Sequence, residues 1–119
     1  MKRLLILLLL IGCSEKKPGS LLAPQAFDIK LKATENAIVL DVRTVEEVNT
    51  GTLENAINIV YDKNFADKLD ALEQKPVFVY CEAGGRSAKA AHILREKGFE
   101  VFELDGGIRA WKDAGMPVR

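Results

Sequence analysis

The sequence predicts an α/β fold: a single domain with a central, mostly parallel sheet of four to five strands and helices on both faces. Helix-like and strand-like segments alternate from about residue 21 onwards, the order typical of parallel strands connected by helices. Two strand-like segments, residues 37–42 and 76–80, are almost continuous apolar runs, as expected of strands buried on both faces. With 119 residues, the chain has room for one hydrophobic core.

The first elements of the predicted domain are a helix, a strand and a second, brief helix. Residues 24–33 mix apolar and polar side chains, and Pro24 stands where the first turn of a helix tolerates proline. The strand over residues 37–42 follows. Thr44 is the expected N-cap of the second helix, which must be brief because Gly51 comes soon after it.

The middle of the chain predicts a short strand, a helix and the clearest strand of all. Residues 55–60 are expected to form the short strand, and residues 64–72 have apolar side chains in helical phase. Residues 76–80 contain valine, phenylalanine and tyrosine, which suit the centre of a parallel sheet. This strand leads directly into Cys81.

The last part of the domain repeats the alternation. Residues 87–97 are helical by pattern, and Gly98 is the natural stop of that helix. Residues 100–104 are expected to form a final strand. A tight turn at Gly106-Gly107 then leads into a last short helix over residues 108–114.

The beginning of the chain has the pattern of an export signal. Lys2 and Arg3 precede an unbroken apolar run over residues 4–11, which small Gly12 and then Cys13 follow. A membrane-spanning helix needs roughly 20 apolar residues, so this run is too short to cross a bilayer. We therefore expect residues 1–12 to be a signal peptide.

The order Leu10-Ile11-Gly12-Cys13 resembles the lipobox of bacterial lipoproteins. That resemblance implies lipidation of Cys13 and several acyl chains on it, and more than one chain is what stable anchoring requires. Residues 13–20 are then the lipidated cysteine and a polar, flexible tether. The protein is expected in the bacterial cell envelope, lipid-anchored and facing the periplasm. An ordinary secretory leader that happens to carry a cysteine is the alternative.

The charge balance argues against a nucleic-acid partner. Lysine plus arginine and aspartate plus glutamate both number 17, so the chain has no net charge at neutral pH. Nucleic-acid binding needs a clustered positive surface, and the sequence contains nothing that resembles one. The pattern also contains no metal-binding motif and no sign of a cofactor.

Cys81 is the residue with the strongest chemical signal. It should lie at the carboxyl end of a central strand, where open α/β sheets bind their ligands. Gly84 and Gly85 allow successive N–H groups to turn inward around the sulfur, and Arg86 and the following helix terminus also favour a thiolate. The alternative is that Cys81 is a small buried hydrophobic residue.

The loop Cys81-Glu82-Ala83-Gly84-Gly85-Arg86-Ser87 resembles the C-x-x-G-x-R-S active-site loop of the rhodanese family. Further segments that resemble family motifs are Asp41-Val42-Arg43 with Glu47 and Gly51, Ala56-Ile57-Asn58-Ile59, Leu104-Asp105-Gly106-Gly107-Ile108, and Trp111 with Gly115-Met116-Pro117-Val118. The chain departs from the family at Thr52, where many relatives have histidine. The resemblance implies a rhodanese-like domain over residues 21–119, of the single-domain periplasmic type.

The resemblance implies a sulfurtransferase without a cofactor or metal. Cys81 would take the outer sulfur of a small anionic donor such as thiosulfate, and cyanide or a thiol would collect it from the persulfide. The donor and the persulfide would be bound by residues of the loop: Glu82, Ala83, Gly84, Gly85, Arg86 and Ser87. Cysteine phosphatases of similar shape use C-x5-R, and the shorter loop here favours sulfur transfer.

Arg86 and Ser87 also have purely structural interpretations. Ser87 could serve as an N-cap, and Arg86 could brace the loop by pairing with a carboxylate. We expect Asp41, Arg43 and Glu47 to fix neighbouring loops by pairing. The remaining candidates are expected outside the site: His92 as a solvated helix residue, and Trp111 as a core residue.

Two other functions remain open at this point. The chain could be a membrane-tethered module that binds another envelope protein or carries sulfur without turnover, because a fold alone does not define an activity. A redox sensor is the other alternative, since an activated thiol in an oxidising compartment is readily oxidised. That interpretation lacks a resolving cysteine.

Overall fold

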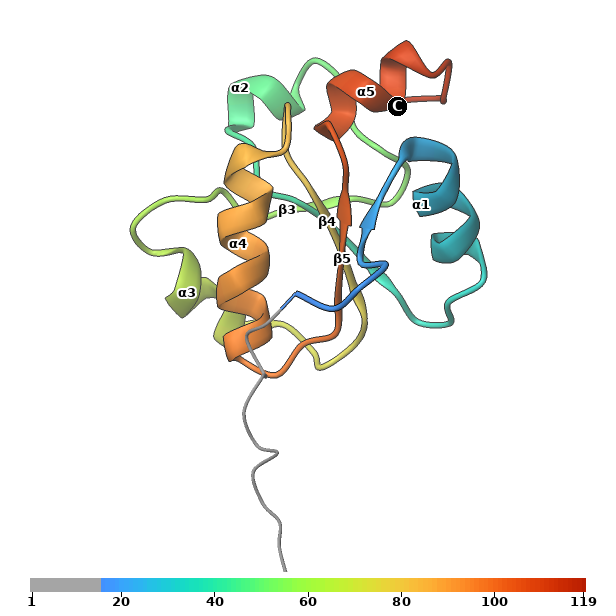
Figure 1. Ribbon diagram of the computed structural model, residues 1–119. Coiled ribbons are helices and arrows are strands. Elements are labelled where there is room, and N and C mark those ends of the chain that lie inside the picture. Colours follow the sequence, from blue (N-terminus) through green and yellow to red (C-terminus); the bar gives the residue numbers. More distant parts are fainter. Residues whose placement is uncertain (1–15) are drawn as a thin grey trace, which may run out of the picture.

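The computed structural model describes residues 16–119, so the predicted signal peptide and lipidation site lie outside the described residues. Five parallel strands form one sheet in the order β1-β5-β4-β2-β3 (Figure 1). The strands are β1 Leu21–Leu22, β2 Ile38–Asp41, β3 Ile57–Asn58, β4 Val77–Tyr80 and β5 Val101–Leu104.

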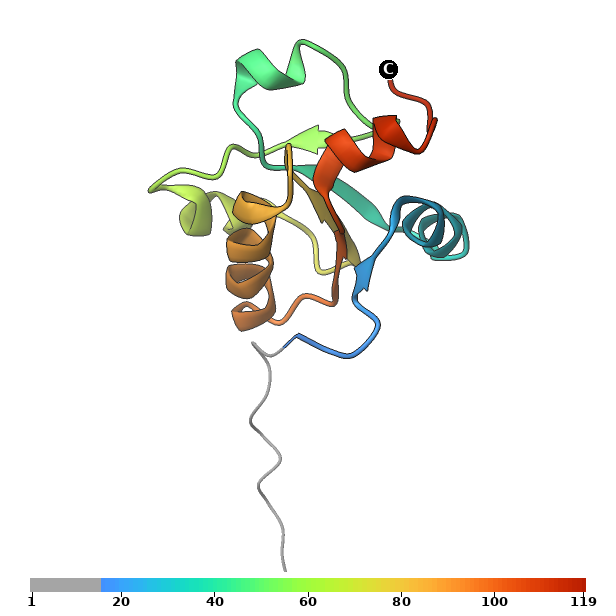
Figure 2. The same cartoon turned by 45° about the horizontal axis from the view of Figure 1, so that its top comes forward.

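Helices cover both faces of this sheet (Figures 1 and 2). They are α1 Pro24–Lys32, α2 Val45–Val48, α3 Phe65–Lys68 with the 3-10 turn Leu69–Ala71, α4 Gly85–Glu96, and α5 Gly107–Asp113. α3 and α4 pack on one face, and α1 and α5 pack on the other. The predicted fold class is therefore confirmed.

Strand β4 divides the interior into two cores. Val77 and Val79 face α3 and α4, whereas Phe78 and Tyr80 face α1 and α5. All four side chains are fully buried. Because successive side chains of a strand point to opposite faces, a strand covered on both sides reads as an unbroken apolar run.

The structure corrects several predicted boundaries. The two residues of β1 pair with β5 but were not predicted, because a two-residue segment has no readable periodicity. Residues 57–58 alone form the strand expected over 55–60. The helix expected from Ser87 starts at Gly85 and is capped by Gly84, so the interpretation of Ser87 as its N-cap is wrong.

A buried polar cluster fixes the start of the described chain to the sheet. Arg95 of α4 donates to the Glu103 carboxylate of β5 at 3.0 Å and to the Ser20 hydroxyl at 3.3 Å. Lys16 lies 3.4 Å from the same carboxylate. The chain therefore enters the domain beside the C-terminal part of α4 (Figure 1). Within residues 16–119, no helix is long and apolar enough to cross a bilayer.

Candidate active site

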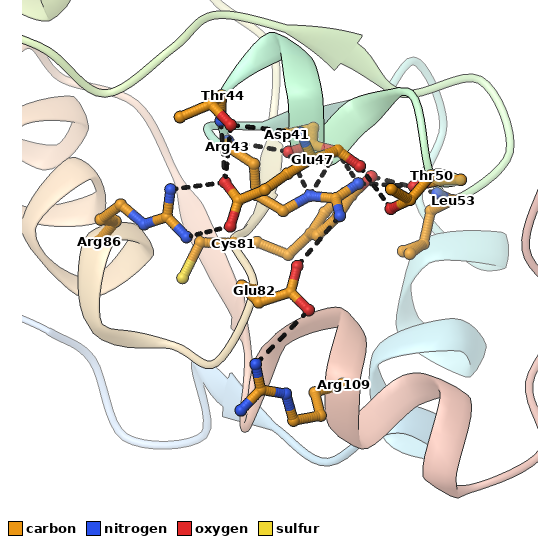
Figure 3. Close-up of polar contacts among 12 residues, drawn as sticks. Asp41, Arg43, Thr44, Glu47, Thr50, Leu53, Cys81, Glu82, Arg86 and Arg109 are labelled. Carbon is orange, nitrogen blue, oxygen red and sulfur yellow. Dashed lines mark hydrogen bonds and ion pairs between the residues drawn. The ribbon is translucent and has the colours of Figure 1, made fainter.

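Cys81 follows the last residue of β4, at the carboxyl end of a strand that lies between β5 and β2. The chain then turns at Gly84, where φ is +114°, a backbone conformation that favours glycine. The turn brings the Gly84 N–H to 3.0 Å from the Cys81 sulfur. A tight loop therefore connects the strand to α4 and curls around the thiol (Figure 3).

Hydrogen bonds from this loop favour the ionised form of Cys81. Burial by itself raises the pKa of the thiol, but donation from the Ser87 hydroxyl and from the N–H groups of Ser87, Gly84 and Ala83 outweighs it. The resulting pKa of Cys81 lies below its ordinary value. The loop thus supplies the activation that a histidine base would otherwise have to provide.

The sulfur lies beneath the rim of the loop. Cys81 is 1% exposed and is in contact with the apolar core below β4. Residues 82–86 above it are partly or fully exposed. Burial alone would fit a structural cysteine, but main-chain N–H groups directed at the sulfur do not. A molecule that reacts with Cys81 would therefore approach it past the exposed residues 82–86.

The first turn of α5 supports the loop from behind. The N–H groups of Ile108 and Arg109 donate to the carbonyl oxygens of Cys81 and Glu82, at 2.9 and 3.1 Å. A Cβ on Gly107, where φ is +67°, would collide with the Glu82 carbonyl oxygen. Because these carbonyls face α5, the following N–H groups are free to point at the sulfur.

Arg86 pairs with Glu47 of α2 and braces the loop against that helix. Its guanidinium donates two hydrogen bonds to the Glu47 carboxylate, at 2.8 and 2.9 Å. Glu47 also completes the capping box of α2 with Thr44. The contact with Arg86 and the bonds from Thr44 lower the pKa of Glu47 to about 2. Bracing of the loop is one of the two roles that the sequence predicts for Arg86.

Arg43 occupies the centre of a buried polar network beside the loop. Its side chain is fully buried and donates to Asp41 at 2.8–3.1 Å and to the Gly51 carbonyl at 2.6 Å. It also donates to Glu82 at 3.2 Å. The network thus ties β2, the α2 segment and the active-site loop together, which is the structural role expected for Asp41 and Arg43.

Two contacts of the loop were not predicted from the sequence. Glu82 lies between Arg43 and Arg109, whose guanidinium is 3.7 Å from its second carboxylate oxygen. Gly107 was expected only to serve a turn. Its contact with Glu82 could not be predicted, since the sequence pattern does not specify the distance between the ends of neighbouring parallel strands and their loops.

The other candidate residues lie outside the site. His92 is exposed on α4 and faces Glu96 at 3.3 Å, as expected of a solvated helix residue. Trp111 is buried and donates from its indole nitrogen to the Pro117 carbonyl. Within residues 16–119, no group of three or more histidine, cysteine or acidic side chains is arranged to hold a metal ion. A cavity of about 430 Å³ beside Trp111 is lined by none of the loop residues 81–87.

The chain is similar in sequence to proteins that contain a rhodanese-like domain. The rhodanese-like domain family matches residues 25–114. The chain is 32% identical over 89 residues to "Putative sulfurtransferase YtwF" of Bacillus subtilis, covering 74% of this chain and 85% of the relative. It is 39% identical over 100 residues to a tRNA uridine(34) hydroxylase of Cytophaga hutchinsonii, covering 78% of this chain and 31% of that enzyme. The chain thus spans about a third of the length of these hydroxylases.

Solved structures show the same relationship. A rhodanese-related protein from Thermoplasma volcanium superimposes with a TM-score of 0.74 at 33% identity, covering 82% of this chain and 95% of that one. A rhodanese-like domain protein from Staphylococcus aureus gives a TM-score of 0.71 at 29% identity, covering 84% and 98%. The chain therefore belongs to the rhodanese-like domain family.

Proposed function

We propose that the protein is a sulfurtransferase that moves sulfane sulfur from a donor such as thiosulfate to cyanide or a thiol through a persulfide on Cys81. The observation that carries this proposal is the hydrogen bond from the Gly84 N–H to the Cys81 sulfur at 3.0 Å, in a loop whose donors lower the pKa of the thiol. A thiolate held by main-chain N–H groups is a nucleophile, and the same groups can stabilise the charge of a persulfide.

The proposed reaction is a double displacement. The Cys81 thiolate attacks the outer sulfur of thiosulfate, a new S–S bond forms, and sulfite leaves with the electron pair of the broken bond. An acceptor thiolate or cyanide then attacks the outer sulfur of the persulfide, and Cys81 leaves as a thiolate. No external oxidant or reductant is needed.

The contacts of the loop favour main-chain donors as the substrate-binding groups. Arg86 makes both of its charged hydrogen bonds to Glu47, so its side chain acts as a brace in this arrangement. The N–H groups of residues 82–86 and the Ser87 hydroxyl then bind the donor and the persulfide. Four residues separate Cys81 from Arg86, and this short loop suits one extra sulfur atom better than a tetrahedral phosphate.

We further propose that the protein is exported and lipid-anchored through Cys13. The support comes from the sequence: a charged start, an apolar run too short to span a bilayer, and the order Leu10-Ile11-Gly12-Cys13. Metabolic labelling with an alkyne fatty acid should mark the wild-type protein and leave Cys13→Ser unlabelled. Equal labelling of both proteins would contradict the assignment.

A binding or sulfur-carrier module without turnover is the second candidate. The similarity to the tRNA uridine(34) hydroxylases favours this function, because the region that matches this chain is only part of those longer proteins. A lipid-tethered domain of this kind would dock another envelope protein. Capture of the same partner by wild type and Cys81→Ser, together with no sulfur transfer, would support this function.

Mass spectrometry of the intact protein tests the proposed reaction directly. After incubation with thiosulfate, the wild-type protein should gain the mass of one sulfur atom, and a thiol acceptor should remove it. Cys81→Ser should gain nothing and should be inactive. Wild-type protein that stays unmodified with thiosulfate and with other sulfane-sulfur donors would contradict the proposal.

A further inference from the structure

Three arginines surround the active-site loop, and each one faces a carboxylate. Arg86 pairs with Glu47 at 2.8 Å. Arg43 pairs with Asp41 at 2.8 Å, and Arg109 faces Glu82 at 3.7 Å. These side chains therefore contribute no surplus positive charge that could bind a dianion next to the Cys81 thiolate.

Glu82 has a special place in this balance because it faces two arginines at once. One carboxylate oxygen accepts from Arg43 at 3.2 Å, and the other faces Arg109 (Figure 3). The Glu82 side chain is 26% exposed and the Arg109 side chain 66% exposed. Arg109 would be the most accessible cation for an incoming anion, but Glu82 neutralises it.

Glu82 and Cys81 adjoin in the active-site loop, so both of their negative charges lie in this loop. Glu82 directly follows the nucleophile, and the negative charges of both residues contribute to raising the pKa of Arg86, after the larger effect of Glu47. A donor bound at the loop would therefore bring its negative charge close to the thiolate and to the Glu82 carboxylate. A second charge on the donor increases this repulsion, because like charges disfavour each other strongly at a partly buried site.

We propose that Glu82 selects the sulfur donor by its charge, favouring singly charged donors such as thiosulfonates and organic persulfides over dianionic thiosulfate. This inference rests on the proposed sulfurtransferase function and specifies its donor class. The N–H groups of the loop, which carry only partial charges, suffice to bind a single negative charge. Glu82 is a specificity-determining residue in this account.

The chemical step is the same for both donor classes. With a thiosulfonate, the Cys81 thiolate forms a bond to the terminal sulfur, and the bond between that sulfur and the sulfonyl sulfur breaks. A sulfinate leaves with the electron pair, and the persulfide anion remains on Cys81. One negative charge enters with the donor and one departs with the sulfinate, so the step is balanced without a further reactant.

Methanethiosulfonate and thiosulfate are the matched probes, because a methyl group in the first replaces one charged oxygen of the second. The test compares kcat/KM for both donors in the full-length protein and its variants. Glu82→Gln keeps an oxygen that can accept from Arg43 and should raise kcat/KM for thiosulfate about tenfold. Its kcat/KM for methanethiosulfonate should change much less.

Two further variants complete the test. Glu73→Gln removes one negative charge at an exposed residue that pairs with Lys75, just before the amino end of β4, and should alter neither value. Arg109→Gln leaves the Glu82 charge less compensated and should lower kcat/KM for thiosulfate several-fold. Because Arg109 is exposed, this variant remains informative if Glu82→Gln does not fold.

The outcomes separate this inference from the proposed function. Wild-type protein that accepts sulfur from neither donor contradicts the sulfurtransferase function itself. An active wild type with the same ratio of the two kcat/KM values in Glu82→Gln and Arg109→Gln overturns only the role of Glu82. A ratio that shifts in opposite directions in these two variants, and not in Glu73→Gln, supports it.

Discussion

The guanidinium of Arg86 is bound by both of its terminal nitrogens to the carboxylate of Glu47, although 39 residues separate them in the chain. This pair joins the first turn of α4 to α2 beside Cys81 (Figure 3). A residue of the family motif that could have bound the substrate is thereby used to hold the loop. Bidentate pairs of this type fix geometry as well as contributing energy.

Glu47→Gln should reduce stability in a pH-dependent way. The pKa of Glu47 is lowered from 4.5 to about 2, so its contribution is fully present above about pH 4.5 and is lost as the pH falls towards 2. At pH 6 the variant should lose about 2 kcal/mol of unfolding free energy, allowing for partial solvent screening. Urea unfolding measures the free energy of unfolding of wild type and Glu47→Gln. The difference between the two proteins should be about half as large at pH 3 as at pH 6. A constant difference would contradict the assignment.

Gly107→Ala should displace the active-site loop. A Cβ at this residue would come within 2.6 Å of the carbonyl oxygens of Cys81 and Glu82, so the loop must shift and its N–H groups must leave the sulfur. We expect loss of most sulfur transfer and a raised pKa of the Cys81 thiol. The pH dependence of iodoacetamide alkylation measures that pKa.

Gly115→Ala is the matched control for this variant. Gly115 has φ of +77°, close to the +67° of Gly107, but a Cβ there meets nothing within 4 Å. Both substitutions therefore place alanine in a left-handed backbone conformation at a similar cost in stability. Only the Gly107→Ala side chain collides with the loop. Equal alkylation profiles for the two proteins would show that the contact with Glu82 does not position the thiol.

Ser87→Ala should raise the pKa of the Cys81 thiol, and it also removes the hydrogen bond from the Ser87 hydroxyl to the Gly84 carbonyl. The Ser87 hydroxyl is a main cause that opposes burial in setting the pKa of Cys81, and the N–H groups of Gly84 and Ala83 remain in the variant. The alkylation profile should shift to higher pH, and the alkylation rate at pH 7 should fall several-fold. An unchanged profile would assign the activation to the main chain alone. Denatured wild-type protein provides the reference thiol.

Arg43→Met should be among the most destabilising substitutions in the domain. It leaves the buried carboxylate of Asp41 without its charged partner, which typically costs about 3–5 kcal/mol. Arg119→Met, which breaks the exposed pair with Glu54, should cost only about 0–1 kcal/mol. Chemical unfolding of both variants compares them, and similar losses would contradict the structural role of the Arg43 network.

The sequence sufficed for those features that depend on local patterns. The apolar run before Cys81 predicted a doubly covered strand, and Thr44 predicted the cap of α2. The start of α4 was misplaced by two residues, because Gly84 and Gly85 are poor helix formers by propensity. In the structure, the left-handed conformation of Gly84 lets the helix begin immediately after it.

The partners of the site residues were less predictable. Two possible roles of Arg86 were clear from the sequence, but only the fold shows that Glu47 lies within reach. The bridging position of Glu82 requires three separate strands to end at one edge of the sheet, so that Arg43 and Arg109 approach it from opposite sides. The spacing of these three residues along the chain therefore does not predict that they meet.

The chain enters the domain beside Arg95, at the far end of α4 from the active-site loop. The 12 residues of α4 correspond to about 18 Å. Residues 14 and 15 alone separate Lys16 from the cysteine that we propose to be lipidated. An anchor on that side of the domain, as proposed above, would leave the Cys81 loop at the opposite end of α4, within reach of water-borne compounds and of bulky carrier proteins.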